Sequence, residues 1–273
     1  MGTSKLATCL VSFVGVTALL TGCRAPSPVR PPLDPLPLAA MVGQINANTT
    51  RITATLRASG PVDGEIVTPE GRHMSFHVNG VLFFLQPTYL RFDLKKLGER
   101  QLLLGSNAAE YWLYTKQDGE YFCGWHGDDT DLPTDLPIHP EQIADALALQ
   151  PIDMNSPATQ LIQRVVAGYQ QLLFLGHDRR GRAIVTKEYW IDRHAPRVVR
   201  RVVFRGATGA VEMESELSDY KIQSDGSLYL PQTIKVSWPT ARMSLAFSVR
   251  KWRLEPTVAR DGPQFATPRE CRP

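Results

Sequence analysis

Hydrophobic positions recur at every second residue along most of the chain, which is the spacing of a β-strand with one buried face. The clearest example is the segment YLRFDLKKLG, where Leu90, Phe92 and Leu94 alternate with charged residues. Similar segments fill residues 51–125 and 169–254, and turns rich in glycine, proline and aspartate separate them. The pattern predicts about eleven short strands in two antiparallel meanders.

Glycine and proline interrupt the alternation at two places in the first meander. The segment RITATLRASG ends at Gly60, which Pro61 follows, and we expect the first strand to stop there. Gly80 lies inside HMSFHVNGVLFFL, where an isolated glycine is typical of a β-bulge that shifts the register. These two positions therefore predict local breaks in the sheet.

Two segments have helical spacing instead. The first covers residues 38–45, where Leu38, Met41, Val42 and Ile45 share one face of a helix. The second follows a proline-rich loop between the meanders, starts at Pro140 and ends before Pro151. Its apolar face consists of Ile143, Leu147 and Leu149. A further helical turn is expected around PATQLIQ, residues 157–163.

These elements predict a mainly β fold (α+β), a curled antiparallel half-barrel covered by the N-terminal helix and the inserted middle helix. A sheet of this size curls, and its apolar inner face needs a cover. A covered, curled sheet can enclose an apolar cavity, which is a usual place for a greasy ligand. The alternative is that the same side chains fill a solid core, and the sequence leaves both open. The inward positions that would line a cavity are Leu90, Phe92, Leu94, Leu102, Leu104, Trp112, Met213, Leu217, Leu245 and Phe247.

The N-terminal segment has the layout of a secretory signal. Lys5 precedes an apolar run at residues 9–20, which is too short to cross a bilayer core of roughly 30 Å as a helix. The signal ends in Leu-Thr-Gly-Cys, which resembles the bacterial lipobox, and this resemblance implies cleavage before Cys23 and acylation of that cysteine. The alternative is a plain cleaved signal with an incidental cysteine. Acyl chains would anchor the chain to membrane lipid, and the proline-rich stretch that follows would be a stiff spacer.

The chain is therefore expected to contain four parts. Residues 1–22 form the signal peptide, and residues 23–37 hold the lipidated cysteine and the proline-rich linker. Residues 38–255 form the half-barrel domain. The tail at residues 256–273 is polar and contains proline, so we expect it to be disordered.

Charge and cysteine content narrow the class of protein further. Without Lys5 the chain has 29 basic residues against 27 acidic ones, and it has no basic run, so we expect no nucleic-acid partner. Once Cys9 is removed with the signal and Cys23 is acylated, Cys123 and Cys271 remain. They could pair in an oxidising compartment or stay apart, because Cys271 lies in the proline-containing tail.

Candidate catalytic and metal sites find little support in the sequence. No Gly-x-Ser-x-Gly elbow, phosphate-binding glycine loop or zinc-protease helix occurs. His73 and His77 would stand about 13 Å apart on a strand and cannot share a metal ion. Cys123 and His126 could bind zinc only with two further ligands, and the alternative is an ordinary strand end. The acidic loop at residues 127–135 lacks the glycine and glutamate of a calcium loop. We expect no enzyme activity, metal or cofactor.

The order of helix, meander, helix in a proline-rich loop and second meander resembles the LolA/LolB superfamily of periplasmic lipoprotein carriers and receptors. The segments that carry the resemblance are ITATLRASGPV, YLRFDLKKLGERQLLLG, EYWLY, EYWIDRHAPRVVRRVVF, LSDYKI and LPQTIKVSW, and together they span roughly residues 38–255. The expected lipid anchor is similar to that of LolB. Arg24 stands where enterobacterial proteins kept on the inner membrane have aspartate, so the resemblance implies the outer membrane, facing the periplasm.

The resemblance also implies a role for one hairpin. In LolB a leucine at the tip of a Pro-Leu-Gly hairpin protrudes and assists insertion of the cargo into the membrane. The matching segment here is Lys95-Lys96-Leu97-Gly98, in which Lys96 replaces the proline. Leu97 is therefore a candidate membrane-insertion tip, and the alternative is that it packs under the edge of the sheet.

Three functions remain open at this point. The first is a non-catalytic, monomeric lipoprotein that binds acyl chains or other lipoproteins in its cavity and helps to localise lipoproteins. The second is an envelope sensor that resembles RseB and binds protein partners. The third is an envelope enzyme with an unrecognised site.

Overall fold

The computed structural model describes residues 31–68, 70–116, 119–126, 140–156, 160–178, 180–223 and 228–271. The chain from Pro32 onward forms one compact unit that contains the described core. The expected signal, the acylation site Cys23 and the acidic loop at residues 127–135 lie outside the described residues.

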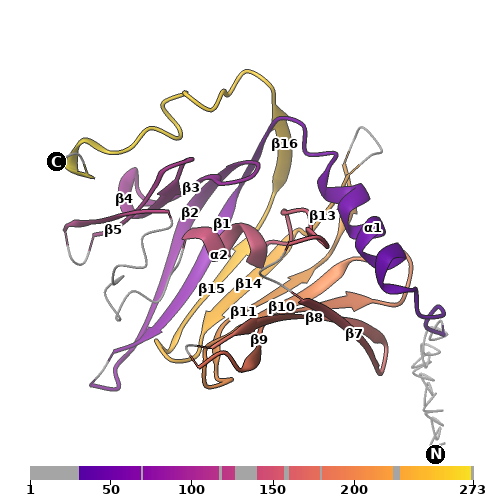
Figure 1. Ribbon diagram of the computed structural model, residues 1–273. Coiled ribbons are helices and arrows are strands. Elements are labelled where there is room, and N and C mark those ends of the chain that lie inside the picture. The colour runs from indigo at the N-terminus through magenta and orange to yellow at the C-terminus, as the bar shows by residue number, and fades with distance from the viewer. Residues whose placement is uncertain are drawn as a thin grey trace, which may run out of the picture. The chain divides into compact units, whose positions relative to one another are not determined.

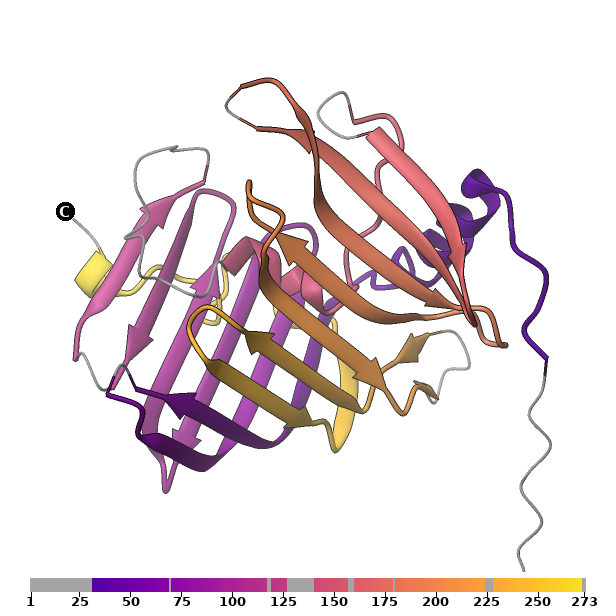
Figure 2. The ribbon, with the colours of Figure 1, turned by 90° about the horizontal axis from the view of Figure 1, so that it is seen from below.

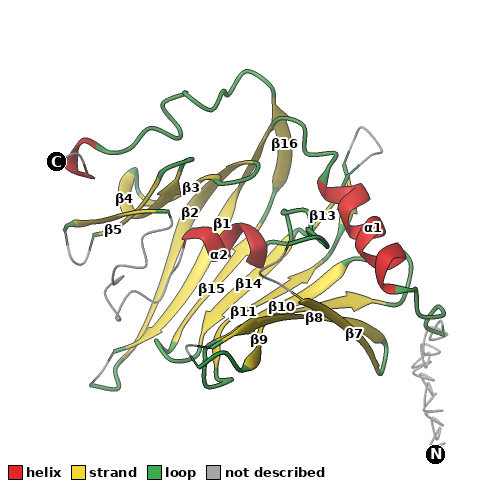
Figure 3. Ribbon diagram, viewed as in Figure 1, coloured by secondary structure: helices red, strands yellow, loops and turns green. Residues whose placement is uncertain are grey.

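The described residues form two α-helices, sixteen strands and one short 3-10 helix (Figures 1 and 3). In chain order these are α1 (Leu38–Thr49), β1 (Thr55–Val67), β2 (His73–Leu85), β3 (Tyr89–Lys96), β4 (Glu99–Ser106), β5 (Glu110–Thr115), β6 (Tyr121–Trp125), α2 (Pro140–Ala146), β7 (Gln160–Val166), β8 (Tyr169–His177), β9 (Ala183–Asp192), β10 (Val199–Arg205), β11 (Val211–Ser218), β12 (Lys221–Ile222), β13 (Tyr229–Leu230), β14 (Thr233–Trp238), β15 (Met243–Ser248), β16 (Lys251–Glu255) and η1 (Arg269–Cys271).

Fourteen of the strands form one antiparallel sheet, in the order β6-β5-β4-β3-β2-β1-β15-β14-β11-β10-β9-β8-β7, with β16 also paired to β1. The sheet curls strongly, as Figure 2 shows from below, and α2 covers its inner face. The predicted fold class, a mainly β half-barrel with two helices, is confirmed. The sheet has more strands than the expected eleven because the last hydrophobic segment divides into β15 and β16. In addition, residues 160–163 belong to β7, so the expected helical turn there is wrong.

Antiparallel pairing places alternate turns on the same edge of the sheet. The turns at residues 68–72, 97–98, 178–182, 206–210 and 239–242 therefore share one edge, which we call the hairpin rim. The turns between β2 and β3, β4 and β5, and β9 and β10 lie on the opposite edge.

Both expected breaks in the first meander are absent. Strand β1 runs through Gly60-Pro61, and at this point its neighbour changes from β16 to β15. A Cβ atom on Gly60 would lie 2.0 Å from the backbone oxygen of Ser248, so only glycine fits beside the gap between the two partner strands. Gly80 pairs with Gly60 in a continuous register, without a bulge. Its missing side chain makes room for Val62, whose Cγ2 atom lies 2.7 Å from the position of a Cβ.

The C-terminal tail is ordered against the outer face of the sheet, which corrects the expectation of disorder. Phe265 is 2% exposed, and its ring contacts the ring of Tyr89 at 5.5 Å. A disulfide joins Cys123 on β6 to Cys271, with 5.6 Å between their Cα atoms. Composition alone does not predict this order, because the segment is mostly polar. One buried aromatic residue and one disulfide hold it in place.

The expected domain boundary at residue 38 also needs correction. The Leu33 amide donates to the carbonyl oxygen of Arg193 at 2.8 Å, and the Leu36 amide donates to Oε1 of Gln170 at 3.1 Å. The end of the proline-rich segment therefore packs along β8 and the turn after β9. In α1, Met41, Val42 and Ile45 are buried, as the spacing predicts.

Polar clusters stabilise the outer face. Asp93 lies on the outer face of β3 and is only 7% exposed, and Arg91 and Arg100 each donate to its carboxylate at 3.1 Å. Burial raises the pKa of Asp93, but the hydrogen bonds from Arg100 and Arg91 outweigh it, so the pKa lies below its ordinary value. Arg91 also contacts the carbonyl oxygen of Gln264 in the tail at 3.4 Å. This charged cluster thus connects the tail to β3 and β4.

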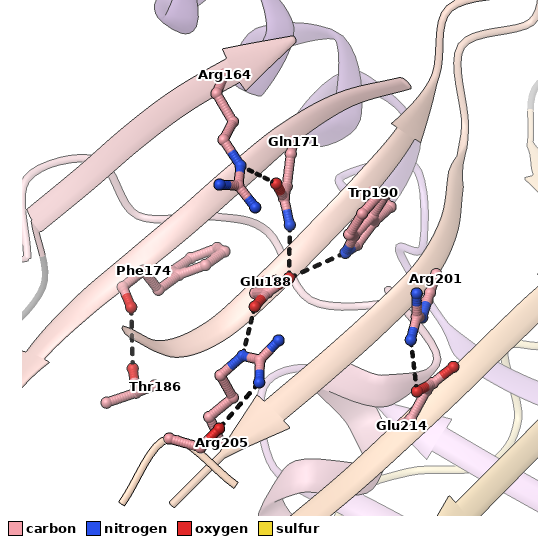
Figure 4. Close-up of polar contacts among 10 residues, drawn as sticks. Arg164, Gln171, Phe174, Thr186, Glu188, Trp190, Arg201, Arg205 and Glu214 are labelled. Carbon is pink, nitrogen blue, oxygen red and sulfur yellow. Dashed lines mark hydrogen bonds and ion pairs between the residues drawn. The ribbon is translucent and has the colours of Figure 1, made fainter. Parts of the chain in front are cut away.

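A second cluster lies on the outer face of β7 to β11 (Figure 4). The buried carboxylate of Glu188 accepts from Nε2 of Gln171 at 2.5 Å, from Nε1 of Trp190 at 3.1 Å and from Arg205. Arg164 in turn donates to Gln171. Both carboxylate oxygens of Glu188 and both amide atoms of Gln171 have a partner, as a structural network requires.

Candidate functional site

An apolar cavity lies between α2 and the inner face of the sheet. Its volume is about 40 Å³. All of its lining residues are hydrophobic, and they come from β2, β3, β4, β14, β15 and the region of α2: Leu82, Phe92, Leu102, Leu104, Ile143, Leu147, Ile234, Val236, Trp238, Leu245 and Phe247. The cavity therefore joins both meanders of the sheet under a single helix.

Five of the ten residues predicted to line a cavity do line it: Phe92, Leu102, Leu104, Leu245 and Phe247. Leu90 lines a separate groove beside α2, whereas Leu94, Met213 and Leu217 are buried in the same core without reaching the cavity. Sequence reasoning missed Leu82, Ile234, Val236 and Trp238 as lining residues, although all four continue the alternation of β2 and β14.

Trp112 is the one predicted lining residue that lies on the wrong face. It pairs with Gly105 and Cys123, whereas the inner row of the same strands runs from Phe92 through Leu104 to Leu113. Trp112 is therefore buried on the outer face. It lies in the same row of side chains as Cys123, which forms the disulfide with the tail. The segment EYWLYT is apolar on both faces, so its alternation does not tell which face is inner.

The cavity is too small for an acyl chain in this structure. Pockets that hold drug-sized ligands have volumes of about 300–1,000 Å³, and about 40 Å³ is far below this range. The volume is enough for only a few water-sized spheres, and the lining offers little to bind water. An acyl chain could enter only if α2 and its flanking residues move away from the sheet.

A larger groove of about 500 Å³ lies on the other side of α2. One wall comes from the turns around Pro87 and Ala108, and the other from Phe174, Lys187 and Tyr189. This groove contains charged and hydroxyl groups as well as apolar ones. Helix α2 therefore separates a mixed groove from an apolar cavity.

Polar contacts hold α2 to the second meander. Nζ of Lys187 lies 2.5 Å from the carboxylate of Asp145, and it also lies 4.3 Å from the centre of the Phe174 ring. The Tyr189 hydroxyl donates to the backbone oxygen of Asp145 at 3.3 Å, and the Ser215 hydroxyl donates to that of Ala146 at 2.5 Å. Burial, and then the charge of Asp145, raise the pKa of Tyr189 well above its ordinary value, so this hydroxyl remains a neutral donor.

The end of α2 is also tied to α1. Nε2 of Gln86 donates to the backbone oxygens of Thr49 and Leu149, both at 3.0 Å. Asn46 and Ile152 exchange two hydrogen bonds, at 2.9 and 2.7 Å. The two helices and the turn after β2 therefore form one connected cover.

Leu97 lies at the hairpin rim and is 99% exposed. It forms a two-residue turn with Gly98, and both residues have positive φ angles, of 51° and 86°. This geometry suits asparagine or glycine and is strained for leucine. Lys95 and Lys96 beside it are exposed. The alternative that Leu97 packs under the sheet edge is therefore wrong.

The zinc hypothesis for Cys123 and His126 is also wrong. Cys123 is bound in the disulfide, and Nε2 of His126 lies 2.9 Å from the backbone oxygen of Asn107. Within the described ranges, histidine, cysteine and acidic residues form no group that could hold a metal ion. In the same ranges, no helix is long and apolar enough to cross a bilayer.

No protein-family model and no curated protein matches the sequence. Solved structures do match the fold. A LolA superfamily protein from Nitrosomonas europaea matches with a TM-score of 0.51, over 81% of this chain and 94% of that one, at 10% identity. The fold is LolA/LolB-like. A DUF1329 family protein from Desulfovibrio piger has the same TM-score and identity, over 82% of this chain and 95% of that one. The LolA/LolB-like fold thus extends over nearly all of the described unit.

Proposed function

We propose that this protein is a periplasmic binding protein that holds the acyl chain of a lipid or lipoprotein between α2 and the sheet, without catalysis. The observation that carries the proposal is the purely hydrophobic lining of the cavity, which comes from both meanders and is covered by one short helix. The likeness to a LolA superfamily protein supports it. Burial of methylene groups would supply the driving force, at about 0.8 kcal/mol per group.

In this mechanism α2 acts as a movable cover. Only one side of α2 packs on the apolar cavity, and the other borders the mixed groove. An entering chain would displace the side chains of Ile143 and Leu147, and the contacts of Asp145 and Ala146 with the sheet would break and re-form. These contacts are few, so they can break while the sheet stays folded.

Anchoring belongs to the same proposal. Acylation of Cys23 would hold the unit at a membrane of the cell envelope. The expected location is the outer membrane, with the unit facing the periplasm. Residues 24–31 would then separate the unit from the bilayer.

The proposal is tested on the unit Pro32–Pro273, expressed in an oxidising compartment. Native mass spectrometry is recorded before and after delipidation, alongside titration with a fluorescent fatty acid. Co-purified lipid, or saturable binding at one site per chain, is the expected result. A clean ligand-free mass with no saturable binding would show that the cavity is permanently filled, and would overturn the proposal.

Weakening the contact between α2 and β9 should speed up ligand entry. A Lys187→Met variant keeps the aliphatic bulk of the side chain but removes the ion pair with Asp145. We expect the association rate of the fluorescent fatty acid, measured by stopped flow, to rise by about three- to tenfold, because the barrier falls by roughly 1 kcal/mol. A Lys235→Met variant, on an exposed position of β14, is the matched control. An unchanged rate in folded Lys187→Met would show that α2 does not control entry.

We also propose that Leu97 contacts the membrane when the ligand is transferred. Full exposure of a strained, apolar tip that directly follows two lysines supports this role. A Leu97→Glu variant is expected to bind phosphatidylglycerol vesicles at least about tenfold more weakly, since one buried leucine contributes about 1.5–3 kcal/mol. Binding of the fluorescent fatty acid should stay the same.

The matched control for this variant is Ile222→Glu, which changes another exposed apolar residue, on β12. Vesicle co-sedimentation measures both variants. Equal vesicle binding by the wild type and Leu97→Glu would show that this tip does not contact the membrane.

A further inference from the structure

The mixed groove beside α2 continues the apolar cavity along the inner face of the sheet. On β3, Leu90 lines the groove and Phe92 lines the cavity, and on β4 Ser106 lines the groove and Leu104 lines the cavity. The two residues of each pair lie about 7 Å apart along their strand. With about 500 Å³, the groove is within the range of about 300–1,000 Å³ that is typical of ligand pockets. A linear ligand can therefore extend from the cavity into the groove.

Two hydrogen-bond donors on β9, Lys187 and Tyr189, line this groove. The side chain of Lys187 is only 18% exposed, and its Nζ lies 4.3 and 5.3 Å from the ring centres of Phe174 and Tyr189. Among the described residues that line the groove, Lys187 is the only lysine or arginine. Strand β9 pairs with β8 on one side and β10 on the other, so both donors belong to the rigid part of the fold.

The acceptors of both donors belong to α2, the element that has to move when an acyl chain enters. Nζ of Lys187 donates to the carboxylate of Asp145 at 2.5 Å, and the Tyr189 hydroxyl donates to the backbone oxygen of the same residue at 3.3 Å. When α2 moves away, both donors lose these acceptors at once. A half-buried ammonium group without a counter-charge costs free energy, so the open state needs another anion at this point.

We propose that an anionic group at one end of the acyl ligand, a carboxylate or a phosphate, replaces Asp145 as the partner of Lys187 and Tyr189. This inference rests on the proposed function and names the class of its ligand, anionic acyl lipids. Hydrogen bonds from an ammonium group to such oxygens are among the strong ones in proteins. Leu90 and Ser106 lie toward the edge opposite the hairpin rim, so the anionic end points to that edge and the hydrocarbon chain toward the rim.

The other titratable groups of the groove make this exchange depend on the movement of α2. Asp153 also lines the groove, where its Oδ1 accepts from the amide of Asn155 at 2.9 Å. Nε2 of His126 lies 2.9 Å from the backbone oxygen of Asn107. With Asp145 in place, the groove has two carboxylates against one ammonium group, which disfavours an anion. Binding of the anionic end is therefore coupled to departure of Asp145 with α2.

The test compares three ligands that have the same decyl-length chain: decanoate, decyl phosphate and the neutral decan-1-ol. Each displaces the fluorescent fatty acid from the unit Pro32–Pro273 at neutral pH. We expect the wild type to bind both anions at least about tenfold more tightly than the alcohol, the effect of one charge-assisted hydrogen bond. Tighter binding of decanoate would point to a free fatty acid, and tighter binding of decyl phosphate to the phosphate of a phospholipid.

Variants at Lys187 test the donor itself. Lys187→Met should bind the anions no more tightly than the alcohol, whereas Lys187→Arg keeps a cation and should keep the preference. Lys235→Met is the matched control, because it removes one positive charge from an exposed position of β14. Loss of the ion pair speeds ligand entry, whereas loss of the ammonium group shortens the residence of an anion. Dissociation constants are therefore compared here, and circular dichroism confirms that each variant is folded.

An Asp145→Asn variant tests the same exchange from the side of α2. It removes the competing carboxylate but leaves the backbone oxygen that Tyr189 contacts. Lys187 then has no ion partner to lose, so the preference for anions over the alcohol should grow by about threefold or more. This variant does not depend on the stability of Lys187→Met. An unchanged or smaller preference in folded Asp145→Asn would overturn the inference.

The inference and the proposed function can fail separately. Equal binding of the anions and the alcohol by the wild type, or an unchanged preference in folded Lys187→Met, would overturn the inference while leaving acyl-chain binding intact. Failure of the fluorescent fatty acid itself to bind would overturn the proposed function and this inference together.

Discussion

A Phe92→Asp variant is expected to bind the fluorescent fatty acid at least about a hundredfold more weakly than the wild type. Phe92 lines the cavity, and its ring packs on Phe247 with 5.4 Å between the ring centres. Aspartate removes this contact and places a carboxyl group among hydrophobic side chains, where an entering chain would have to displace its water. Burying an unpaired charge costs several kcal/mol, and every 1.4 kcal/mol is a factor of ten.

The pH dependence of fatty-acid binding by this variant separates the effect of the introduced charge from the effect of the lost packing contact. Burial raises the pKa of a carboxyl group, so the introduced aspartate becomes neutral as the pH falls. Binding should therefore recover partly in acid, whereas loss of packing alone would persist at every pH. Circular dichroism at each pH confirms that the variant is folded.

Phe83→Asp is the matched control. Phe83 lies on the neighbouring strand and faces outward, where it is opposite Arg91 and beneath the guanidinium of Arg57 at 5.7 Å. The new carboxylate there has cationic neighbours and lies away from the cavity. Fatty-acid binding should remain within about twofold of the wild type. Normal binding by folded Phe92→Asp would show that the ligand does not enter this cavity.

Replacing both Cys123 and Cys271 with serine is expected to lower the free energy of unfolding by about 2–4 kcal/mol. The bond links residues 148 positions apart, so without it the unfolded chain regains much conformational freedom. The tail also loses its attachment beyond the buried Phe265. Urea denaturation followed by tryptophan fluorescence measures the change.

Single Cys123→Ser and Cys271→Ser variants should show the same loss as the double variant, because either one breaks the bond. A reducing agent should destabilise the wild type by a similar amount and leave the double variant unchanged. Fatty-acid binding should survive in all of them, because the disulfide lies on the face opposite the cavity. An unchanged free energy of unfolding in the double variant would show that the disulfide does not stabilise the fold.

Local patterns in the sequence determined the fold class and half of the predicted cavity-lining residues. Alternation of hydrophobic residues depends only on neighbouring positions, so the inward row of β3 and the apolar faces of both helices could be predicted from residues such as Phe92 and Ile143. The order of the elements then pointed to a curled sheet covered by helices, and the structure confirms this architecture.

Register and long-range contacts decided the rest. A period of two shows which residues share a face but not which face is inner, so Trp112 was assigned to the cavity although its strand pairs put it on the outer face. The order of the tail depends on Cys123, which lies 148 residues away from its partner Cys271. The exposure of Leu97 and the volume of the cavity are also properties of packed surfaces. Only the tertiary structure brings those surfaces together, because the contacts that define them join residues far apart in the chain.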